Sequence, residues 1–429
     1  MKQYDNYKNS GVEWLGEIPE HWEVSRLGTL LNPISTNNRI DLPLLSITRE
    51  KGVILRDLDN DDENHNFIPD DLSNYKVVRK GQFGMNKMKA WQGSYGISDY
   101  DGIVSPAYFI FEVDSKIEPK YFHASIRSKL YISFFGAASD GVRIGQWDLS
   151  KPRMKQIPFL IPPKEEQTAI ANFLDDKTTK IDQAIAIKQQ QIALLQERRQ
   201  ILIHNAVTRG LNEKVKLKDS GVEWIGEIPE HWEVKKMTNV CKIDTGATPD
   251  RSNSSYWQGN IPWIKTGEVN YELITSAEEF ITIKGLKNSS TRLAPIGTLL
   301  MAMYGQGVTR GRVSILGIEA TYNQACCAML FNKNIHNKYA YYFFIMAYSY
   351  IRDGGNETSQ MNISAGYISN LKILQPPIIE QQIIIEFIET ASTKIFNAIS
   401  LKEQEIEKLK EYKMSLIDGV VTGKVRVIS

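Results

Sequence analysis

The chain of 429 residues is long enough for two to four domains, and its apolar (42%) and charged (24%) fractions are ordinary for a globular protein. Its 51 Lys and Arg residues nearly cancel its 50 Asp and Glu residues, which excludes a global electrostatic attraction to nucleic acid or membranes. No stretch looks like a signal peptide or reaches the roughly 18 apolar residues of a spanning helix. We therefore expect a cytoplasmic protein, whose three cysteines are buried free thiols.

The first element in chain order is a motif that occurs twice. The stretch SGVEWLGEIPEHWEV (Ser10–Val24) returns as SGVEWIGEIPEHWEV (Ser220–Val234), with Leu15 replaced by Ile225. A repeat of this length indicates that two parts of the chain solve the same packing problem. We expect its aromatic side chains to be packing or capping residues, with partner contact as the alternative for the tryptophans; they are Trp14, Trp22, Trp224, Trp232, His21 and His231.

A variable region follows each copy of the motif, at residues 25–156 and 235–370. The two regions share little sequence, but IEPKYFHASIRS (Ile117–Ser128) matches IHNKYAYYFFIMA (Ile335–Ala347). We therefore expect one fold that carries two different surfaces.

Glycine-punctuated, aromatic and basic stretches in both regions are candidates for DNA contact, because Arg and Lys recognise guanine and phosphate while Asn and Gln recognise adenine. The alternative is that these stretches are ordinary solvated surface. The candidate DNA-binding residues are Lys76, Lys87, Lys89, Trp91, Gln92, Ser94, Tyr95, Arg251, Tyr256, Trp257, Lys265, Thr266, Tyr304, Gln306, Thr309, Arg310 and Arg312.

A double proline then opens a long segment in each half. No Gly or Pro occurs from Pro163 to Gly210 or from Pro377 to Gly419, which predicts two helices of about 40 residues, each roughly 60 Å long. Apolar residues recur at heptad spacing, so we expect the helices to pair with each other. Lys188 and Lys402 interrupt both seams, either as register-setting positions or as snorkelling side chains. The expected helix-pairing residues are Leu174, Ile181, Ile185, Ile192, Leu195, Leu202, Ile388, Ile395, Ile399, Ile406, Leu409 and Leu416.

If the two helices pair antiparallel, one carries the chain to the second variable region and the other returns it to the first. The sequence thus predicts a circular arrangement with a pseudo-twofold axis, in which the repeated motif lies where a returning helix meets the next half.

Catalytic signatures are weak. The sequence has no phosphate-binding glycine loop, GxSxG, HExxH or paired CxxC. Asp70, Glu118 and Lys120 are residue types that a magnesium-dependent nuclease uses, but Glu118 aligns with His336 in the other half. We therefore expect no catalytic residues and no metal site.

The whole chain resembles the specificity subunits of type I restriction-modification systems. The resemblance is carried by the repeated motif, by the helix entries IPPKEEQ and QPPIIEQ, and by two long stretches, NKMKAWQGSYGISDYDGIVSPAY (Asn86–Tyr108) and MYGQGVTRGRVSILGIEATYNQACCA (Met303–Ala328).

This resemblance implies an α+β (mixed α/β) chain. It would have a first target recognition domain at 1–161, a spacer helix at 162–209, a second target recognition domain at 210–375, and a second spacer helix with a closing tail at 376–429. The chain would be a non-catalytic reader of a bipartite, asymmetric sequence with a fixed gap in double-stranded DNA, acting in DNA methylation and in defence against foreign DNA.

The implied partners are two modification subunits and, through them, two restriction subunits, with no membrane. The chain itself would hold no cofactor, because S-adenosylmethionine, ATP and Mg²⁺ are expected on the partner subunits. The alternative is a non-catalytic protein-binding scaffold without DNA specificity, which predicts no sequence-dependent and salt-dependent duplex binding.

Overall fold

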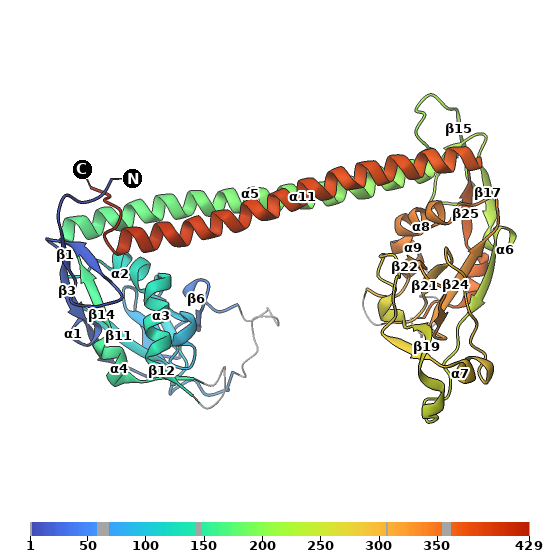
Figure 1. Cartoon of the computed structure of the whole chain (residues 1–429). Helices are drawn as coiled ribbons and strands as arrows, with labels where there is room; N and C mark the ends of the chain where they lie inside the picture. The colour runs from blue at the N-terminus through green and yellow to red at the C-terminus, as the bar shows by residue number, and fades with distance from the viewer. Residues whose placement is uncertain (1, 58–67, 142–146, 306–307, 354–361, 429) are drawn as a thin grey trace. The chain divides into compact units, whose positions relative to one another are not determined.

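The computed structural model describes residues 2–57, 68–141, 147–305, 308–353 and 362–428, which form two compact units (Figure 1). Unit 1 comprises Met1–Gln189 with Glu403–Ser429, and unit 2 comprises Gln190–Lys402. Each unit combines one copy of the repeated motif, one variable region and a part of each long helix, α5 (Lys164–Arg209) and α11 (Ile378–Val421). The expected mixture of helices and strands with two long helices is confirmed.

Unit 1 is built from short elements. Its described strands are β1 (Tyr7–Asn9), β2 (Glu17–Pro19), β3 (Glu23–Arg26), β4 (Leu31–Ile34), β5 (Leu45–Thr48), β6 (Gly52–Leu55), β7 (Lys76–Val78), β8 (Phe83–Met85), β9 (Tyr95–Ile97), β10 (Gly102–Val104), β11 (Phe109–Val113), β12 (Ser139–Asp140), β13 (Asp148–Leu149) and β14 (Pro158–Ile161). Its shorter helices are α1 (Leu27–Leu30), the 3₁₀ turn η1 (Ala90–Gln92), α2 (Pro119–Ile126), α3 (Lys129–Ala137) and α4 (Lys151–Gln156).

Unit 2 repeats much of this order. Its described strands are β15 (Leu217–Asp219), β16 (Glu227–Pro229), β17 (Glu233–Lys236), β18 (Cys241–Thr245), β19 (Trp257–Ile264), β20 (Glu279–Ile281), β21 (Leu299–Ala302), β22 (Val313–Ile315), β23 (Thr321–Tyr322), β24 (Cys326–Phe331) and β25 (Lys372–Gln375). Its shorter helices are α6 (Met237–Val240), the 3₁₀ turns η2 (Ser254–Tyr256) and η3 (Thr266–Glu268), α7 (Ile283–Lys287), α8 (Asn337–Met346), α9 (Tyr348–Asp353) and α10 (Ala365–Asn370).

The two units share a common frame of strand pairings, but they differ in the additional strands attached to it. A four-stranded antiparallel sheet has the order β4-β11-β8-β9 in unit 1 and the corresponding order β18-β24-β21-β22 in unit 2. The strand pairs β1-β2 and β14-β3 likewise correspond to β15-β16 and β17-β25. Unit 2 adds the sheet β20-β19-β23, whereas the described part of unit 1 has the pairs β5-β6, β10-β7 and β12-β13. One frame therefore supports two different surfaces.

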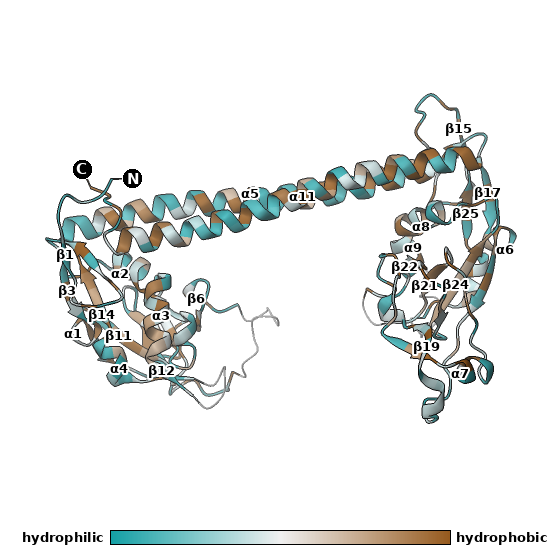
Figure 2. Cartoon of the chain, in the orientation of Figure 1, coloured by the Kyte–Doolittle hydropathy of each residue, from teal (hydrophilic) through white to brown (hydrophobic). Residues whose placement is uncertain are grey.

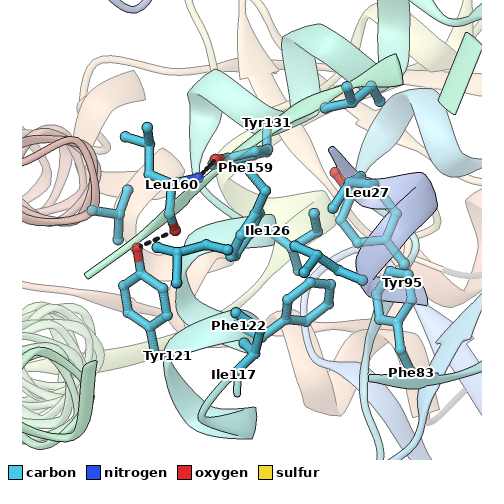
Figure 3. Packing of buried hydrophobic residues seen from close by; sticks show 14 of the residues in the cluster. Leu27, Phe83, Tyr95, Ile117, Tyr121, Phe122, Ile126, Tyr131, Phe159 and Leu160 are labelled. Carbon is cyan, nitrogen blue, oxygen red and sulfur yellow. Dashed lines mark hydrogen bonds between the residues drawn. The ribbon is translucent and has the colours of Figure 1, made fainter. Parts of the chain in front are cut away.

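An aromatic core joins the sheet of unit 1 to its helices (Figure 3). Phe122 lies between Phe83 and Phe159, at 5.1 Å from each ring centroid. The hydroxyl of Tyr121 donates to the Leu160 carbonyl at 3.0 Å, and the Leu160 amide donates to the hydroxyl of Tyr131 at 3.2 Å. Buried tyrosines that keep a hydrogen-bond partner fix the register of β14 without leaving polar atoms unsatisfied.

The long helices pair antiparallel within each unit. In unit 1, Leu174 and Ile181 of α5 share a cluster with Leu416 of α11, while Lys188 pairs with Glu405 at 2.5 Å and Lys413 pairs with Asp182 at 2.6 Å. In unit 2 the side chain of Arg199 donates to the Ser392 hydroxyl at 3.2 Å. The residue numbers of the contacting positions increase along α5 while they decrease along α11, so the two helices are antiparallel.

The expected pairing residues lie on the inner faces of these helices. All twelve are buried or half-buried, and Lys188 at the interruption reaches an acid on the opposite helix. Apolar residues elsewhere on the helices face outwards, since Ile187 is 55% exposed and Leu401 is 61% exposed. Figure 2 shows the resulting alternation of polar and apolar residues along both helices. The residues at heptad spacing are therefore the more buried ones on each helix.

A buried glutamine fastens each helix entry to its unit. Gln167 donates from Nε2 to the carbonyls of Pro162 at 2.9 Å and Lys116 at 3.2 Å, and its Oε1 accepts from the Glu118 amide at 2.7 Å. Gln381 makes the matching bonds to Pro376, Asn334 and the amide of His336, each at 2.8 Å. The bracket uses only backbone groups of positions 118 and 336, so their side chains are free to differ.

The repeated motif packs against these helix entries. Trp22 and Trp232 are fully buried, and the Nε2 atoms of His21 and His231 lie 2.8 Å from the carboxylates of Glu166 and Glu380 respectively. The two remaining tryptophans differ, because Trp224 stacks on Tyr350 at 4.5 Å whereas Trp14 is 66% exposed.

The two ends of the chain meet in unit 1 (Figure 1). The Arg426 amide donates to the Lys2 carbonyl at 2.9 Å, the Arg426 guanidinium pairs with Asp5 at 3.2 Å, and the Tyr7 hydroxyl donates to the Gly423 carbonyl at 3.1 Å. The end of α11 therefore closes onto the start of the chain.

The cysteines carry no disulfide. Cys326 and Cys327 are buried and Cys241 is half-buried, and burial raises the pKa of Cys241 and of Cys327 to about 12. Among the described residues, none of the helices combines the length and the apolar character needed to cross a membrane.

Candidate nucleic-acid interface

Three lysines lie near one another in unit 1. Lys76 donates from Nζ to the Tyr108 carbonyl at 2.7 Å, and burial together with the charges of Lys151 and Lys87 lowers the pKa of Lys76. Lys87 forms an ion pair with Asp148 at 2.8 Å. Neighbouring ammonium groups repel one another, so a ligand rich in hydrogen-bond acceptors would stabilise their charged forms at this position.

An indole pair lies in the next candidate stretch of unit 1. The turn η1 places Trp91 beside Trp147, with ring centroids 5.2 Å apart. Lys89 is exposed and Gln92 is half-buried, so both keep a polar group at the surface beside this pair. A cation and an amide beside two packed indole rings are groups that can contact phosphate and base edges.

Two candidates of unit 1 were assigned wrongly. Ser94 and Tyr95 are buried, and the ring of Tyr95 packs 4.5 Å from Phe135 and 5.9 Å from Phe83 in the core (Figure 3). Tyr95 lies on β9, the edge strand of the central sheet, whose three residues are all buried. Burial of the strand therefore removes both side chains from contact with DNA.

The guanidinium of Arg251 is the best-defined cation of unit 2. It lies over Trp257 at 3.8 Å and over Trp263 at 4.8 Å, and it pairs with Glu279. Both indoles are themselves held, because their Nε1 atoms donate to the carbonyls of Asp250 at 3.1 Å and Ala247 at 2.9 Å. The stacked arginine is thus pre-organised and has lost its side-chain freedom before any ligand arrives. The nearby candidate Tyr256 is half-buried at the end of η2.

A cleft of about 590 Å³ opens beside this arginine. Lys265 and Thr266 line it, and the Nζ atom of Lys265 pairs with Glu278 at 2.7 Å and with Glu279 at 3.2 Å. These two carboxylates raise the pKa of Lys265, and Arg251 is the main cause of a lowered pKa at Glu279. The candidates Arg251 and Lys265, 14 positions apart in sequence, are therefore joined through one acid pair.

Several polar residues of this cleft were not predicted from the sequence. Thr248, Asn323 and Gln324 also line it, and the Thr248 hydroxyl donates to Oε1 of Gln324. The parallel pairing of β19 with β23 brings residues 323 and 324 beside residue 265. Periodicity in the sequence carries no signal for such a pairing, since β23 is only two residues long.

The last candidate stretch divides into exposed and buried residues. Tyr304 is exposed, Thr309 is half-buried, and Arg312 lies with its guanidinium 5.7 Å from the Tyr271 ring. Gln306 lies outside the described residues. Arg310 was assigned wrongly as a surface contact, because it is buried and donates from a guanidinium nitrogen to the Arg352 carbonyl at 2.8 Å. Arg310 instead ties its loop to the end of α9.

The residues that suggested a nuclease form no metal cluster. Glu118 lies 4.0 Å from Lys164, and Lys120 lies 3.8 Å from Asp175, so both side chains pair with α5. Within the described ranges, no group of three or more acids, histidines or cysteines could hold a metal ion.

Comparisons with known proteins agree with this organisation. The family described as "Type I restriction modification DNA specificity domain" matches residues 19–197 and 229–411, one match in each half. The chain is 29% identical over 198 residues to the type I restriction enzyme MjaIX specificity subunit of Methanocaldococcus jannaschii, covering 45% of this chain and 44% of the relative. It is 26% identical over 285 residues to the EcoR124I/EcoR124II specificity subunit of Escherichia coli, covering 64% and 65%. The chain thus spans less than two thirds of each of these relatives.

Solved structures share the fold. The HsdS subunit from Thermoanaerobacter tengcongensis matches with a TM-score of 0.57 and 15% identity, covering 95% of this chain and 98% of that one. A chain from a study of complex assembly and conformational transition of the type I R-M system matches with a TM-score of 0.74 and 14% identity, covering 95% and 99%. Two family matches that together span most of the sequence, on a frame built twice, establish that the chain belongs to the type I restriction modification DNA specificity family.

Proposed function

We propose that this chain is the sequence-reading subunit of a type I restriction-modification enzyme, and that it recognises a bipartite, asymmetric target in double-stranded DNA without catalysis. The observation that supports the proposal is that the two units repeat one arrangement of strands but present different polar surfaces. Unit 1 presents Lys76, Lys87 and an indole pair, whereas unit 2 presents a stacked arginine and a cleft. Two different surfaces suit two different half-sites, while one protein partner bound twice would favour two identical surfaces.

The fixed gap between the half-sites would follow from the two long helices. The helices α5 and α11 are 46 and 44 residues long. Each residue adds the same rise to a helix, so a fixed number of residues gives a fixed length. Half-sites about one DNA turn apart, roughly 34 Å, present themselves on one face of the duplex. We expect the unread gap to be independent of the side chains in the variable regions.

Two modification subunits would dock on the outward faces of these helices. Ile187 and Leu401 are exposed apolar residues at equivalent positions, separated by the same 214 residues that separate Pro162 from Pro376. An exposed apolar residue at the same position of both helices would offer two copies of one partner the same contact. The modification subunits would supply S-adenosylmethionine and the adenine methylation chemistry, and two restriction subunits would supply ATP-driven and Mg²⁺-dependent cleavage.

The decisive experiment compares genomic methylation in a host that carries this chain with its cognate modification subunit and in the same host without this chain. Methylated adenines in a two-part motif with a fixed gap, present only with the chain, are the expected result. Methylation that persists unchanged after deletion would overturn the reader function and favour the protein-binding scaffold.

Docking is tested by a matched pair of substitutions on α5. Ile187→Asp changes an exposed residue, so we expect unchanged thermal stability and at least tenfold weaker association with the modification subunit in a pull-down titration. Ile181→Asp places a carboxylate in the buried seam, where we expect a stability loss of about 3 kcal/mol. Unchanged association of the Ile187→Asp chain would contradict docking at this face.

A further inference from the structure

The cleft of unit 2 carries an unusual charge balance for a surface that meets DNA. Its two cations, Arg251 and Lys265, are both paired with carboxylates, and Glu268 and Glu278 are among its lining residues. A phosphate contact needs uncompensated positive charge, because its strength comes from neutralising the backbone and releasing counterions. This cleft offers no such excess.

The hydrogen-bond donors and acceptors of this cleft instead lie side by side, and backbone hydrogen bonds hold them in place. The Glu268 carboxylate accepts from the Lys265 amide at 2.7 Å and from the Glu278 amide at 2.9 Å, so this one side chain fixes the backbone of both residues. Lys265 has three N–H donors, and its ion pairs with Glu278 and Glu279 leave one donor for a ligand. Glu278, whose side chain is 68% exposed, has a second oxygen to accept a hydrogen bond.

This pattern is complementary to one base pair. In the major groove a G·C pair presents the O6 and N7 acceptors of guanine next to the N4 amino donor of cytosine. Lys and Arg donate to the guanine acceptors, and a carboxylate accepts from cytosine N4. An A·T pair presents acceptors and a donor in a different order, because the N6 donor of adenine lies between its N7 acceptor and the O4 acceptor of thymine, whereas a G·C pair places both acceptors on the guanine and the donor on the cytosine.

We propose that the cleft of unit 2 reads a G·C base pair, with Lys265 donating to guanine and Glu278 accepting from cytosine N4. Arg251, fixed on its two indoles, acts as a positioning residue that holds Glu279 and through it Lys265. The inference rests on the proposed function and assigns one base pair of the half-site that unit 2 reads.

The test uses the whole chain assembled with its modification subunit, and it compares methylated motifs of the wild type and of Lys265→Met and Glu278→Gln variants. We expect one G·C position in one half of the motif to become degenerate, with its preference over other pairs falling at least tenfold in Lys265→Met. The other half of the motif stays unchanged. Lys265→Arg keeps a guanine donor and restores the preference, which separates reading from misfolding.

A matched control is the ion pair of Lys235 and Glu233 on β17, which is 2.8 Å long against 2.7 Å for Lys265 and Glu278. The exposed fractions of its side chains, 35% and 58%, resemble the 33% and 68% of Lys265 and Glu278. Glu233→Gln should leave the motif unaltered. Loss of specificity in this control as well would overturn the assignment, because it would mean that any surface pair of unit 2 has the same effect.

Salt dependence distinguishes base reading from phosphate contact. Lys265→Met should leave the slope of log K against log salt concentration unchanged, whereas loss of one phosphate contact reduces its magnitude by about 0.9. Uniformly weaker binding to all sequences with a reduced slope would overturn the inference but leave the reader function intact. Absence of any chain-dependent motif in the wild type would overturn the proposed function itself.

Discussion

At the scale of single residues, His123 links pH to the stability of unit 1. The imidazole Nδ1 accepts from the Ile97 amide at 3.2 Å, and burial together with the neighbouring Arg127 lowers the pKa of His123 to about 4. The guanidinium of Arg127 is fixed near His123, because it donates to the carbonyls of Tyr95, Arg49 and Glu50 at 2.7 to 2.8 Å. The neutral imidazole is therefore the form that fits the fold.

Acidification should destabilise unit 1 through this histidine. The unfolded chain takes up a proton near pH 6.5 but the folded chain does so only near pH 4, so the unfolded state binds more protons in this window and stability falls as the pH falls. We expect His123 to account for a loss of about 2 kcal/mol between pH 7.5 and pH 5. Urea unfolding of the His123→Gln chain, which keeps an acceptor but does not titrate, should lack this part of the pH dependence. Equal pH profiles of the two chains would contradict it.

Single-residue burial was also the hardest property to predict from the sequence. Lys76, Lys87 and Arg251 keep polar groups available, but Tyr95 and Arg310 occur in equally basic and aromatic stretches and are buried. Local composition is the same in both cases, and only the pairing of distant strands and loops decides which side chains turn inwards. The partner of each cation was likewise outside the reach of sequence patterns, because Glu278 and Glu279 approach Lys265 through the sheet.

At the scale of elements, the pairing of α5 and α11 depends on an apolar seam whose register is marked by cross-helix charges. Asp182 and Lys413 contribute one such pair at 2.6 Å, with exposed fractions of 57% and 29%. A partly exposed pair of this kind contributes about 0.5 kcal/mol, since solvent screens it.

A double-mutant cycle measures this coupling. Asp182→Lys and Lys413→Asp should each destabilise unit 1 by about 0.5 to 1 kcal/mol, while the exchanged double variant should recover most of the loss. Urea unfolding of the four chains gives the coupling free energy. Strictly additive effects would show that the two charges do not interact across the helices.

The long helices were the most predictable elements, and the sheets were the least. Two double prolines, an uninterrupted run without Gly or Pro, and a heptad spacing all indicate the same helix, and their agreement makes the prediction strong. Most strands are only two to five residues long. Such strands contain too few residues for an alternating pattern to stand out, so their order in the sheet depends on long-range packing.

At the scale of the whole molecule, the contact between the two ends of the chain suggests that chain order is not essential to the fold. The segment around Lys2 and Asp5 is hydrogen-bonded to Arg426, and the described loop from Leu211 to Lys216 joins α5 to β15 in unit 2. A chain that is opened in that loop and linked from residue 428 to residue 2 would keep the contacts of both helices with their units that are described above.

We expect this permuted chain to fold with a thermal midpoint within a few degrees of the wild type and to direct methylation to the same motif. The reason is that the break and the linker both lie outside the cores, where insertions are tolerated. Circular dichroism melting and genomic methylation measure the two outcomes. A permuted chain that folds but directs a different motif would show that chain order contributes to reading.

The glutamine brackets at Gln167 and Gln381 have a consequence for how such genes change over time. Each bracket fastens a long helix to the preceding variable region through backbone groups alone, so it places no demand on the side chains of that region. Recombination between genes at the repeated motif and at the helix entry would exchange an entire variable region while preserving every bond of the joint. New recognition specificities can therefore arise by exchange of ready-made parts, without first losing a stable fold.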